Sequence, residues 1–184
     1  MPDLVLNADP EIWSLVPDWQ QALAWREQRT ATTEAERRAD VFEAATLALR
    51  TRAEVDATHV LFLDAVGHRL LGALAVFAYD DVPAASSRTQ AEEIARAMVP
   101  SAWEVHSIVA DLGAGPGWRV TVIDAPLTDD GAQVALVEAV WTVYVLEAAG
   151  RLVVGLLSAM SPPNAALAQV HAERVLVTMK VVQE

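Results

Sequence analysis

The chain has 184 residues, of which 53% are hydrophobic and 21% are charged, a composition typical of one globular domain that spans residues 1–184. Its formal net charge is −12 at pH 7. Because acidic surfaces repel phosphate backbones and anionic lipid headgroups, this charge argues against nucleic acids and membrane surfaces as partners.

The N-terminal residues Met1 to Asn7 lack the basic stretch and the apolar core of a signal peptide. No window of the sequence reaches 18 uncharged apolar residues, the length that a membrane-spanning helix needs. We therefore expect a cytoplasmic protein. Leu4 to Leu6 is predicted to form a short edge strand, and Asn7, Asp9 and Pro10 indicate a turn after it.

Trp13, Trp19 and Trp25 lie six residues apart, a spacing that puts all three on no common face of a helix or a strand. One interpretation is an exposed aromatic patch that binds a protein partner. The other is an irregular segment that fills the core with three large side chains, which is the more usual environment of tryptophan. The three tryptophans are the candidate partner-binding residues of the sequence.

Thr33-Glu34-Ala35-Glu36 matches a capping box, which predicts a helix that continues to about Arg52. Arg37 and Arg38 stand among acidic residues and are predicted to lie on the solvated face of this helix. The predicted apolar stripe consists of Ala35, Ala39, Phe42, Ala45, Thr46 and Leu49.

Residues 58–65 and 69–80 predict a β-hairpin. Gly67-His68 suits a two-residue turn in which the glycine takes a positive φ. The run Val60 to Leu63 is apolar on both faces, which indicates a strand covered on both sides.

Ser87-Arg88-Thr89-Gln90 is a second capping-box pattern, and it predicts a helix that ends before Pro100. Two strands are expected next, over residues 103–111 and 118–124. Alternation of apolar and polar residues in the second strand turns Trp118, Val120 and Val122 inward.

Gln133 to Met160 predicts one long β-hairpin, around which the rest of the chain is organised. Asp129-Asp130-Gly131 is the predicted turn into it. A closing helix is expected from about Asn164 to Val182, and the β-branched residues from Val175 onward leave its end open to a strand. The predicted fold is therefore α+β: a mostly antiparallel sheet of about six strands flanked by helices.

Residues 107–117, Ser-Ile-Val-Ala-Asp-Leu-Gly-Ala-Gly-Pro-Gly, resemble the first motif of class I methyltransferases. That resemblance implies an S-adenosylmethionine site made of Asp111, Gly113, Gly115, Gly117 and Asp124. However, Trp118 to Ile123 already alternates as a strand and leaves no room for the crossover helix of that fold. We therefore expect a glycine-rich turn between antiparallel strands, and no cofactor.

Other catalytic patterns are missing from the sequence. It has no cysteine, no Gly-x-Ser-x-Gly elbow and no Walker pattern, and its four histidines share no metal-ligand spacing. The acidic pairs Asp80-Asp81 and Asp129-Asp130 suit a calcium site or an acid–base pair, but aspartate is also a common turn former. We predict no catalytic residues and no metal. The histidines are His59, His68, His106 and His171.

The strand from Val134 to Glu147, the Ala149-Gly150 turn, the strand from Arg151 to Ser158 and Pro162-Pro163 together resemble part of a known group of proteins. These are small actinobacterial proteins of unknown function with a PsbP-like fold, an antiparallel sheet flanked by helices. The Gly113 to Val120 segment is similar to the strand connection that precedes this part there. PsbP-like proteins with known roles are mostly accessory or scaffolding factors, so the resemblance implies an interaction module.

Three functions remain open. The leading hypothesis is a non-enzymatic accessory or protein-interaction domain, and the alternative is a small-molecule-binding protein with a pocket between sheet and helices. A small enzyme is the third, because catalytic residues converge in space and not in sequence. A homodimer through a long edge strand such as Leu152 to Met160 is also considered.

Overall fold

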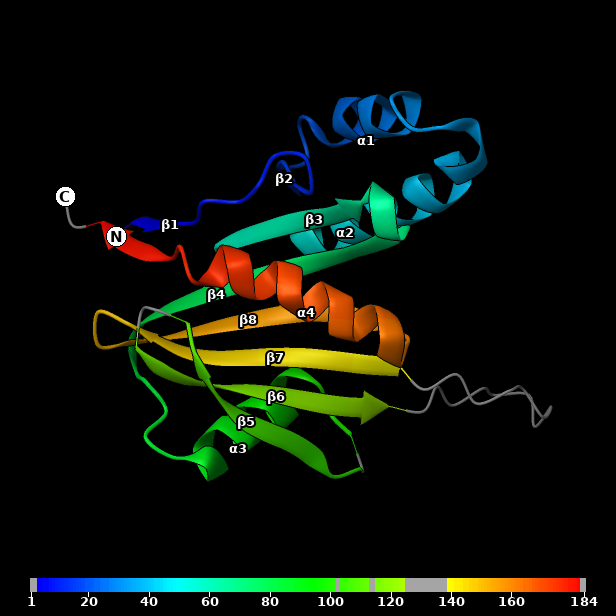
Figure 1. The fold of residues 1–184 in the computed structure, drawn as a ribbon. Coiled ribbons are helices and arrows are strands. Elements are labelled where there is room, and N and C mark those ends of the chain that lie inside the picture. Colours follow the sequence, from blue (N-terminus) through cyan, green and yellow to red (C-terminus); the bar gives the residue numbers. More distant parts are fainter. Residues whose placement is uncertain (1–2, 102, 113–114, 125–138, 183–184) are drawn as a thin grey trace.

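The computed structural model describes residues 3–101, 103–112, 115–124 and 139–182. The described elements are β1 (Asp3–Val5), β2 (Trp13–Leu15), α1 (Ala22–Ala31), η1 (Ala35–Arg37), α2 (Arg38–Glu54), β3 (His59–Ala65), η2 (Val66–His68), β4 (Leu70–Pro83), α3 (Arg88–Met98), β5 (Val105–Asp111), β6 (Pro116–Asp124), β7 (Ala139–Ala148), β8 (Arg151–Met160), α4 (Pro162–Leu176) and β9 (Lys180–Val182). Figure 1 shows how they are arranged.

Seven strands form the main sheet in the order β2-β3-β4-β8-β7-β6-β5, and every neighbouring pair is antiparallel. The α+β class and the antiparallel sheet flanked by helices are thus confirmed, with one strand more than expected. β8 occupies the middle of the sheet (Figure 1). The prediction that Leu152 to Met160 forms an edge strand was wrong. The apolar run of β8 reflects burial on both faces, which is the usual reason for such runs.

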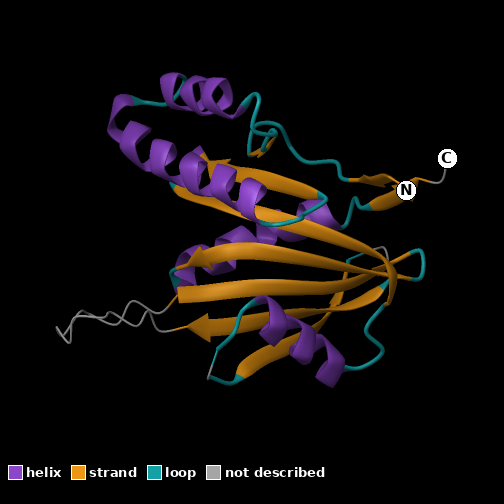
Figure 2. Ribbon diagram, turned by 180° about the vertical axis from the view of Figure 1, so that it is seen from behind, coloured by secondary structure: helices purple, strands orange, loops and turns teal. Residues whose placement is uncertain are grey.

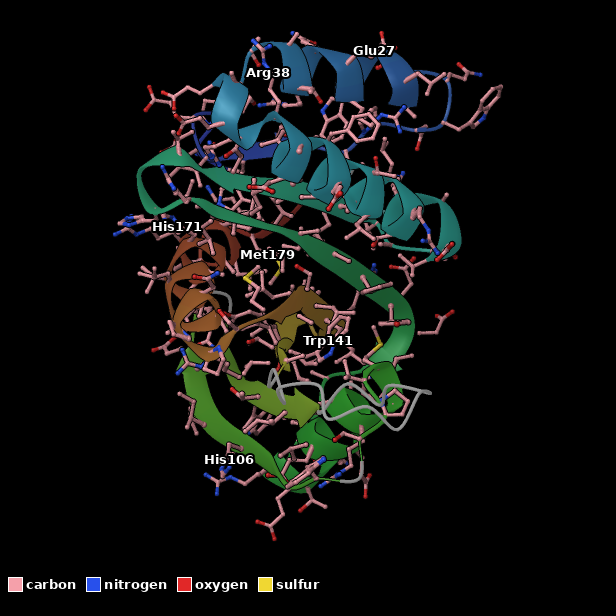
Figure 3. The ribbon with its side chains drawn as sticks, turned by 90° about the vertical axis from the view of Figure 1, so that its right-hand side faces the viewer. Glu27, Arg38, His106, Trp141, His171 and Met179 are labelled. Carbon is pink, nitrogen blue, oxygen red and sulfur yellow. The ribbon has the colours of Figure 1, made fainter. Side chains whose placement is uncertain are left out.

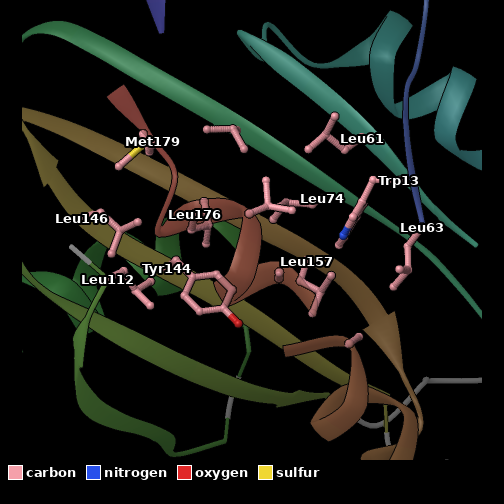
Figure 4. Packing of buried hydrophobic residues seen from close by; sticks show 14 of the residues in the cluster. Trp13, Leu61, Leu63, Leu74, Leu112, Tyr144, Leu146, Leu157, Leu176 and Met179 are labelled. Carbon is pink, nitrogen blue, oxygen red and sulfur yellow. The ribbon is translucent and has the colours of Figure 1, made fainter. Parts of the chain in front are cut away.

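Helices cover both faces of the sheet. On one face, α4 contacts β4, β7 and β8 and closes a core that contains Trp13, Leu74, Tyr144 and Leu176 (Figure 4). On the other face, α2 contacts β3 and β4, while α3 contacts β5, β6 and β7. Viewed from this second side, strands in the centre of the sheet are visible between the two helices (Figure 2). The sheet is therefore covered at its two sides there, and less so in the middle.

The organising hairpin is confirmed for its described part, β7 and β8. Ala149 and Gly150 connect the strands with φ values of 53° and 80°, the pair of positive values that a tight two-residue hairpin turn requires. The predicted beginning of the first arm and the turn at residues 129–131 lie outside the described residues.

The β3–β4 hairpin is confirmed, but its turn is not the predicted one. A short 3₁₀ segment, η2, joins the strands, and the positive φ of 50° falls on Arg69 instead of Gly67. The connection is longer than two residues, so the left-handed position moves to the residue that leads into β4. Val60 to Leu63 are buried on both faces, as predicted.

The prediction that Thr33 and Glu36 form a capping box at the start of a helix was wrong. The Thr33 hydroxyl donates to the Arg29 carbonyl oxygen at 2.8 Å, so it closes the end of α1 and does not begin α2. The inner face of α2 consists of Val41, Ala45 and Ala48, whereas Phe42 is 42% exposed. Helical spacing predicts Phe42 on the apolar stripe, but in the structure the Phe42 side chain faces α1.

Of the second predicted capping box, the Ser87 half was confirmed and the Gln90 half was wrong. The Ser87 hydroxyl accepts from the backbone N–H of Gln90 at 3.3 Å and caps α3. The Gln90 side chain, however, accepts from the backbone N–H of Ser86 at 2.8 Å and does not reach back to Ser87. Both bonds still occupy free donors at the start of the helix.

The two ends of the described chain meet in a second, two-stranded sheet. Leu4 pairs with Val181 between β1 and β9 (Figure 1). The closing helix therefore ends at Leu176. The β-branched residues at 181 and 182 form a strand, which is one of the two outcomes that the sequence allows. β5 and β6 pair from Val105–Val122 to Asp111–Pro116, which confirms antiparallel strands where a methyltransferase would need a helix.

Candidate functional site

The three tryptophans lie in different surroundings. Trp13 is 4% exposed and packs in the core with Leu61 and Leu63 (Figure 4). Trp25 is half-buried and meets Phe62 edge-on, with ring centroids 5.6 Å apart and an interplanar angle of 83°. Trp19 is 81% exposed. They therefore form no single patch, and Trp19 is the one that offers a large free surface.

Two aliphatic residues close to Trp19 in the sequence are also exposed. Leu15, at the end of β2, is 59% exposed, and Leu23, in the first turn of α1, is 65% exposed. We call Leu15, Trp19 and Leu23 the N-terminal surface. Sequence reasoning had selected the region by its tryptophans and had not singled out the two leucines, because a lone leucine carries no signal of exposure.

α1 is the least buried of the four described α-helices. No residue of α1 is fully buried, and the helix packs mainly on α2. The Arg26 guanidinium lies over the Phe42 ring, 4.4 Å from its centroid, and donates to the Thr46 hydroxyl at 3.3 Å. Such an element buries little apolar area and is expected to open locally more readily than the sheet.

A cleft of about 500 Å³ lies beside Trp19, between the segment that precedes α1 and the second half of α2. Arg52 makes two bonds beside this cleft. Its guanidinium donates to the Asp18 carboxylate at 2.9 Å and to the Ala57 carbonyl oxygen at 2.6 Å. The segment that precedes α1, which we call the entry segment, is thereby linked to α2 and to the connection between α2 and β3. The lining residues are Pro17, Asp18, Trp19, Gln20, Ala22, Leu49, Arg52 and Ala53.

A second hollow, which we call the trough, lies on the sheet beside α2. Its volume is about 340 Å³, and its lining is mostly apolar. Small residues make its floor, and Trp141 lies on the sheet between α2 and α3 (Figure 3). The lining residues are Leu47, Arg50, Thr51, Glu54, Ala73, Ala75, Trp141, Leu156, Ser158 and Ala159.

A β-bulge shapes the end of the trough. The register between β7 and β8 shifts from Thr142–Leu157 to Val140–Met160, so Ser158 and Ala159 both lie opposite Trp141. The Ser158 hydroxyl accepts from the backbone N–H of Ala73 at 3.0 Å and so replaces a bond of the sheet ladder. The apolar periodicity of the sequence does not indicate such a bulge. The sequence therefore did not predict the trough.

A buried ion pair fixes the start of α2. Arg37, predicted to be solvated, is 7% exposed, and its guanidinium lies 2.7 Å from the Asp64 carboxylate. Arg37 is the last residue of η1 and turns inward toward the end of β3, which explains why the solvated-face prediction was wrong. This pair tethers η1 and α2 to the sheet.

A polar network lies under α4. The Arg119 guanidinium donates to the Glu173 carboxylate at 2.6 Å, and the Gln169 amide donates to the Thr142 hydroxyl at 3.0 Å. Tyr144 is fully buried beside them; burial raises the pKa of its hydroxyl, and nearby Glu173 adds to the rise. The tyrosine therefore stays protonated, and the network serves to orient α4 on the sheet.

The histidines do not converge on one site. His59 bonds the Leu4 carbonyl oxygen at 2.6 Å, and the rings of His68 and His171 lie 6.2 Å apart. Burial lowers the pKa of His171, with Arg174 and His68 acting in the same direction. His106 points away from the sheet (Figure 3).

Within the described residues, no group of three or more histidine or acidic side chains is placed to hold a metal ion. Asp80 is ion-paired with Arg151 at 2.5 Å, so it joins β4 to β8. The acidic pair at residues 129–130 lies outside the described residues. Across residues 3–101, 103–112, 115–124 and 139–182, no helix has the length and apolar character needed to span a membrane.

The chain matches no protein-family model and no curated protein. Among solved structures, its fold is similar to the crystal structure of LpqN, a protein described as involved in cell envelope biogenesis of Mycobacterium tuberculosis. The two share 11% sequence identity with a TM-score of 0.46, over 100% of this chain and 85% of the other. We transfer no residue role or activity from this likeness, and the PsbP-like resemblance stays a prediction.

The Arg37–Asp64 pair generates a stability prediction. Replacing Asp64 with Asn leaves the buried guanidinium without its countercharge, which is expected to lower the free energy of unfolding by about 3 kcal/mol. Glu54→Gln is the matched control, because the Arg50–Glu54 pair is exposed on both sides at 3.5 Å and should cost less than about 0.5 kcal/mol. Urea denaturation measures both; equal losses would show that the buried pair does not anchor α2.

Proposed function

We propose that this protein is a non-enzymatic accessory module that binds a protein partner through the N-terminal surface. The observation that carries the proposal is the exposure of Leu15, Trp19 and Leu23, at 59%, 81% and 65%, within nine residues of chain. Large apolar side chains gathered at a surface are typical of interaction sites. Tryptophan is also among the residues that most often dominate binding energy in protein interfaces.

The local structure suits docking of a side chain. The cleft beside Trp19 has walls from the entry segment and from Leu49 and Ala53 of α2. Arg52 holds these walls together by its bonds to Asp18 and Ala57. A partner side chain that enters the cleft therefore meets a preformed wall, which lowers the entropic cost of binding.

The charge of the chain defines the chemistry of the partner. The formal net charge is −12, and the Asp18 side chain at the cleft is 75% exposed. A partner that presents an apolar side chain surrounded by lysine or arginine is complementary to this surface. Opposite net charge also steers the encounter, so its rate should fall as salt is added.

Binding should depend on Trp19. Trp19→Ala removes the exposed indole and is expected to weaken partner binding at least tenfold, while leaving the fold intact because little of the side chain is buried. Tagged wild-type protein and the variant are each used to purify partners from cells of the source. Affinity for the purified partner is then measured by titration calorimetry at two salt concentrations.

Trp103→Ala is the matched control, because Trp103 is 58% exposed but lies just before β5. A partner that binds wild type and Trp103→Ala alike, and binds Trp19→Ala at least tenfold more weakly, supports the proposal. A partner that binds Trp19→Ala with unchanged affinity contradicts it. Affinity that rises with salt would contradict the assignment of a basic partner.

The trough supports a second candidate function, the binding of a small apolar molecule. Its floor of Ala73, Ala75 and Leu156 is apolar, while Arg50, Thr51 and Glu54 provide polar groups at the α2 wall. Apolar hollows with a few polar groups are the usual form of small-molecule sites. Its volume of about 340 Å³ falls at the small end of such sites.

The fluorescent apolar anion anilinonaphthalene sulfonate provides the probe for this candidate. Native protein is expected to bind it at one site, and Leu47→Glu should weaken binding about tenfold by removing apolar area and adding like charge. Leu47 is 60% exposed, so the fold should tolerate the change. Val66→Glu, at a residue 53% exposed outside the trough, is the control. Equal binding by all three proteins would place the probe elsewhere and contradict the candidate.

A further inference from the structure

The outer side of β5 differs from the other end of the sheet. β5 is the last strand of the main sheet, and among the described residues it pairs with β6. Its pairing runs without a register shift over all seven residues from Val105 to Asp111. The strand at the opposite end, β2, has three residues. A long regular edge strand presents a row of backbone N–H and C=O groups to any second strand that approaches.

Several of the usual protections of an edge strand are missing from β5. Residues 105–111 contain no proline, lysine or arginine, and the β5–β6 register has no bulge. Natural proteins use these devices to prevent edge-to-edge pairing. Ile108 is 48% exposed and Val109 is 66% exposed, and because they are adjacent in a strand they lie on opposite faces of the sheet. Nearby Trp103 is 58% exposed. Apolar side chains therefore accompany the outer edge of β5.

We propose that β5 pairs with β5 of a second copy of this chain, antiparallel about a two-fold axis, so that two sheets join into one continuous sheet. This inference is independent of the N-terminal surface and of the trough. An antiparallel pair of identical strands is isologous, so each residue of one copy meets the same patch on its partner. Ile108 is the middle residue of β5, and the axis is centred there.

The chemistry of β5 favours this register. Ile108 meets its own copy, Ser107 meets Val109, and His106 meets Ala110. Asp111 meets Val105 across the axis, so no two like charges face each other. The two Asp111 residues lie six residues apart along the strand, about 20 Å, beyond the screening length of about 8 Å at physiological salt. The Ser107 hydroxyl is already bonded to Glu92 of α3, which holds β5 against its own helix.

The net charge opposes association and gives the dimer a distinctive salt dependence. Two copies with a formal charge of −12 each repel at long range, and this repulsion is screened by salt. Because β5 carries one carboxylate, Asp111, and no opposed like charges, dimerisation through it should strengthen as salt is added. Binding of a basic partner at the N-terminal surface should respond in the opposite direction, so the two interactions are separable.

Sedimentation velocity of the purified full chain tests the proposal. The protein is expected to shift from 19.8 kDa toward twice that mass as its concentration or the salt concentration rises. Val109→Lys adds a charge to the edge and should weaken dimerisation at least tenfold. Val66→Lys, the same change at a residue of similar exposure on η2, should leave dimerisation unchanged. A single 19.8 kDa species up to about 1 mM protein in high salt would overturn the proposal.

A cysteine cross-link reads the register directly, because the natural chain has no cysteine. Opposed residues of antiparallel strands have Cα atoms about 4.5 to 5.5 Å apart, within the range that a disulfide spans. Under mild oxidation, Ile108→Cys should give a covalent dimer much faster than Val66→Cys. Circular dichroism confirms that each variant is folded. Cross-linking of both variants at the same rate would show random collision and overturn the assignment to β5.

Discussion

Three helices cover the two faces of a seven-stranded sheet, and the other features of the molecule depend on how that limited cover is distributed. α4 occupies one face above β4, β7 and β8, while α2 and α3 take the two sides of the other face. The first half of the middle strand β8 is buried as a result, whereas Leu156, Ser158 and Ala159 in its second half are only half-buried, where the trough lies. What the helices leave open is the trough beside α2 and the outer side of β5. These openings follow from the architecture and need no special sequence motif.

The first forty residues are joined to this frame by a few specific contacts. Trp13 enters the core, the Arg37–Asp64 pair fixes the start of α2, and Arg52 connects Asp18 to Ala57. α1 lies outside these contacts and has no fully buried residue. A rigid frame with a loosely held helix and exposed Trp19 beside it suits a module whose work is binding. Elements that bind ligands or partners are often drawn from the less stable parts of a fold.

The sequence predicts the sheet well because apolar alternation reports burial directly. The pattern of apolar residues predicted the β3–β4 and β7–β8 hairpins and the antiparallel strands β5 and β6, while the capping-box pattern predicted the α3 cap at Ser87. The order of the strands could not be predicted in this way. A long apolar strand gives no sign of whether it is central, and β8 was predicted to lie at an edge. Side-chain partners were also hidden, because the ion pair of Arg37 joins residues 27 positions apart. For the candidate site, spacing identified Trp19 but did not distinguish it from buried Trp13.

Native-state hydrogen exchange tests most directly the claim that a rigid central sheet carries a loosely held N-terminal element. Amides of β4, β7 and β8 should exchange only through global unfolding. Those of α1 should exchange at least about 100-fold faster, a difference of about 2.8 kcal/mol in opening free energy. Exchange of α1 as slow as that of β8 would contradict the account, because α1 would then be part of the same cooperative unit as the sheet.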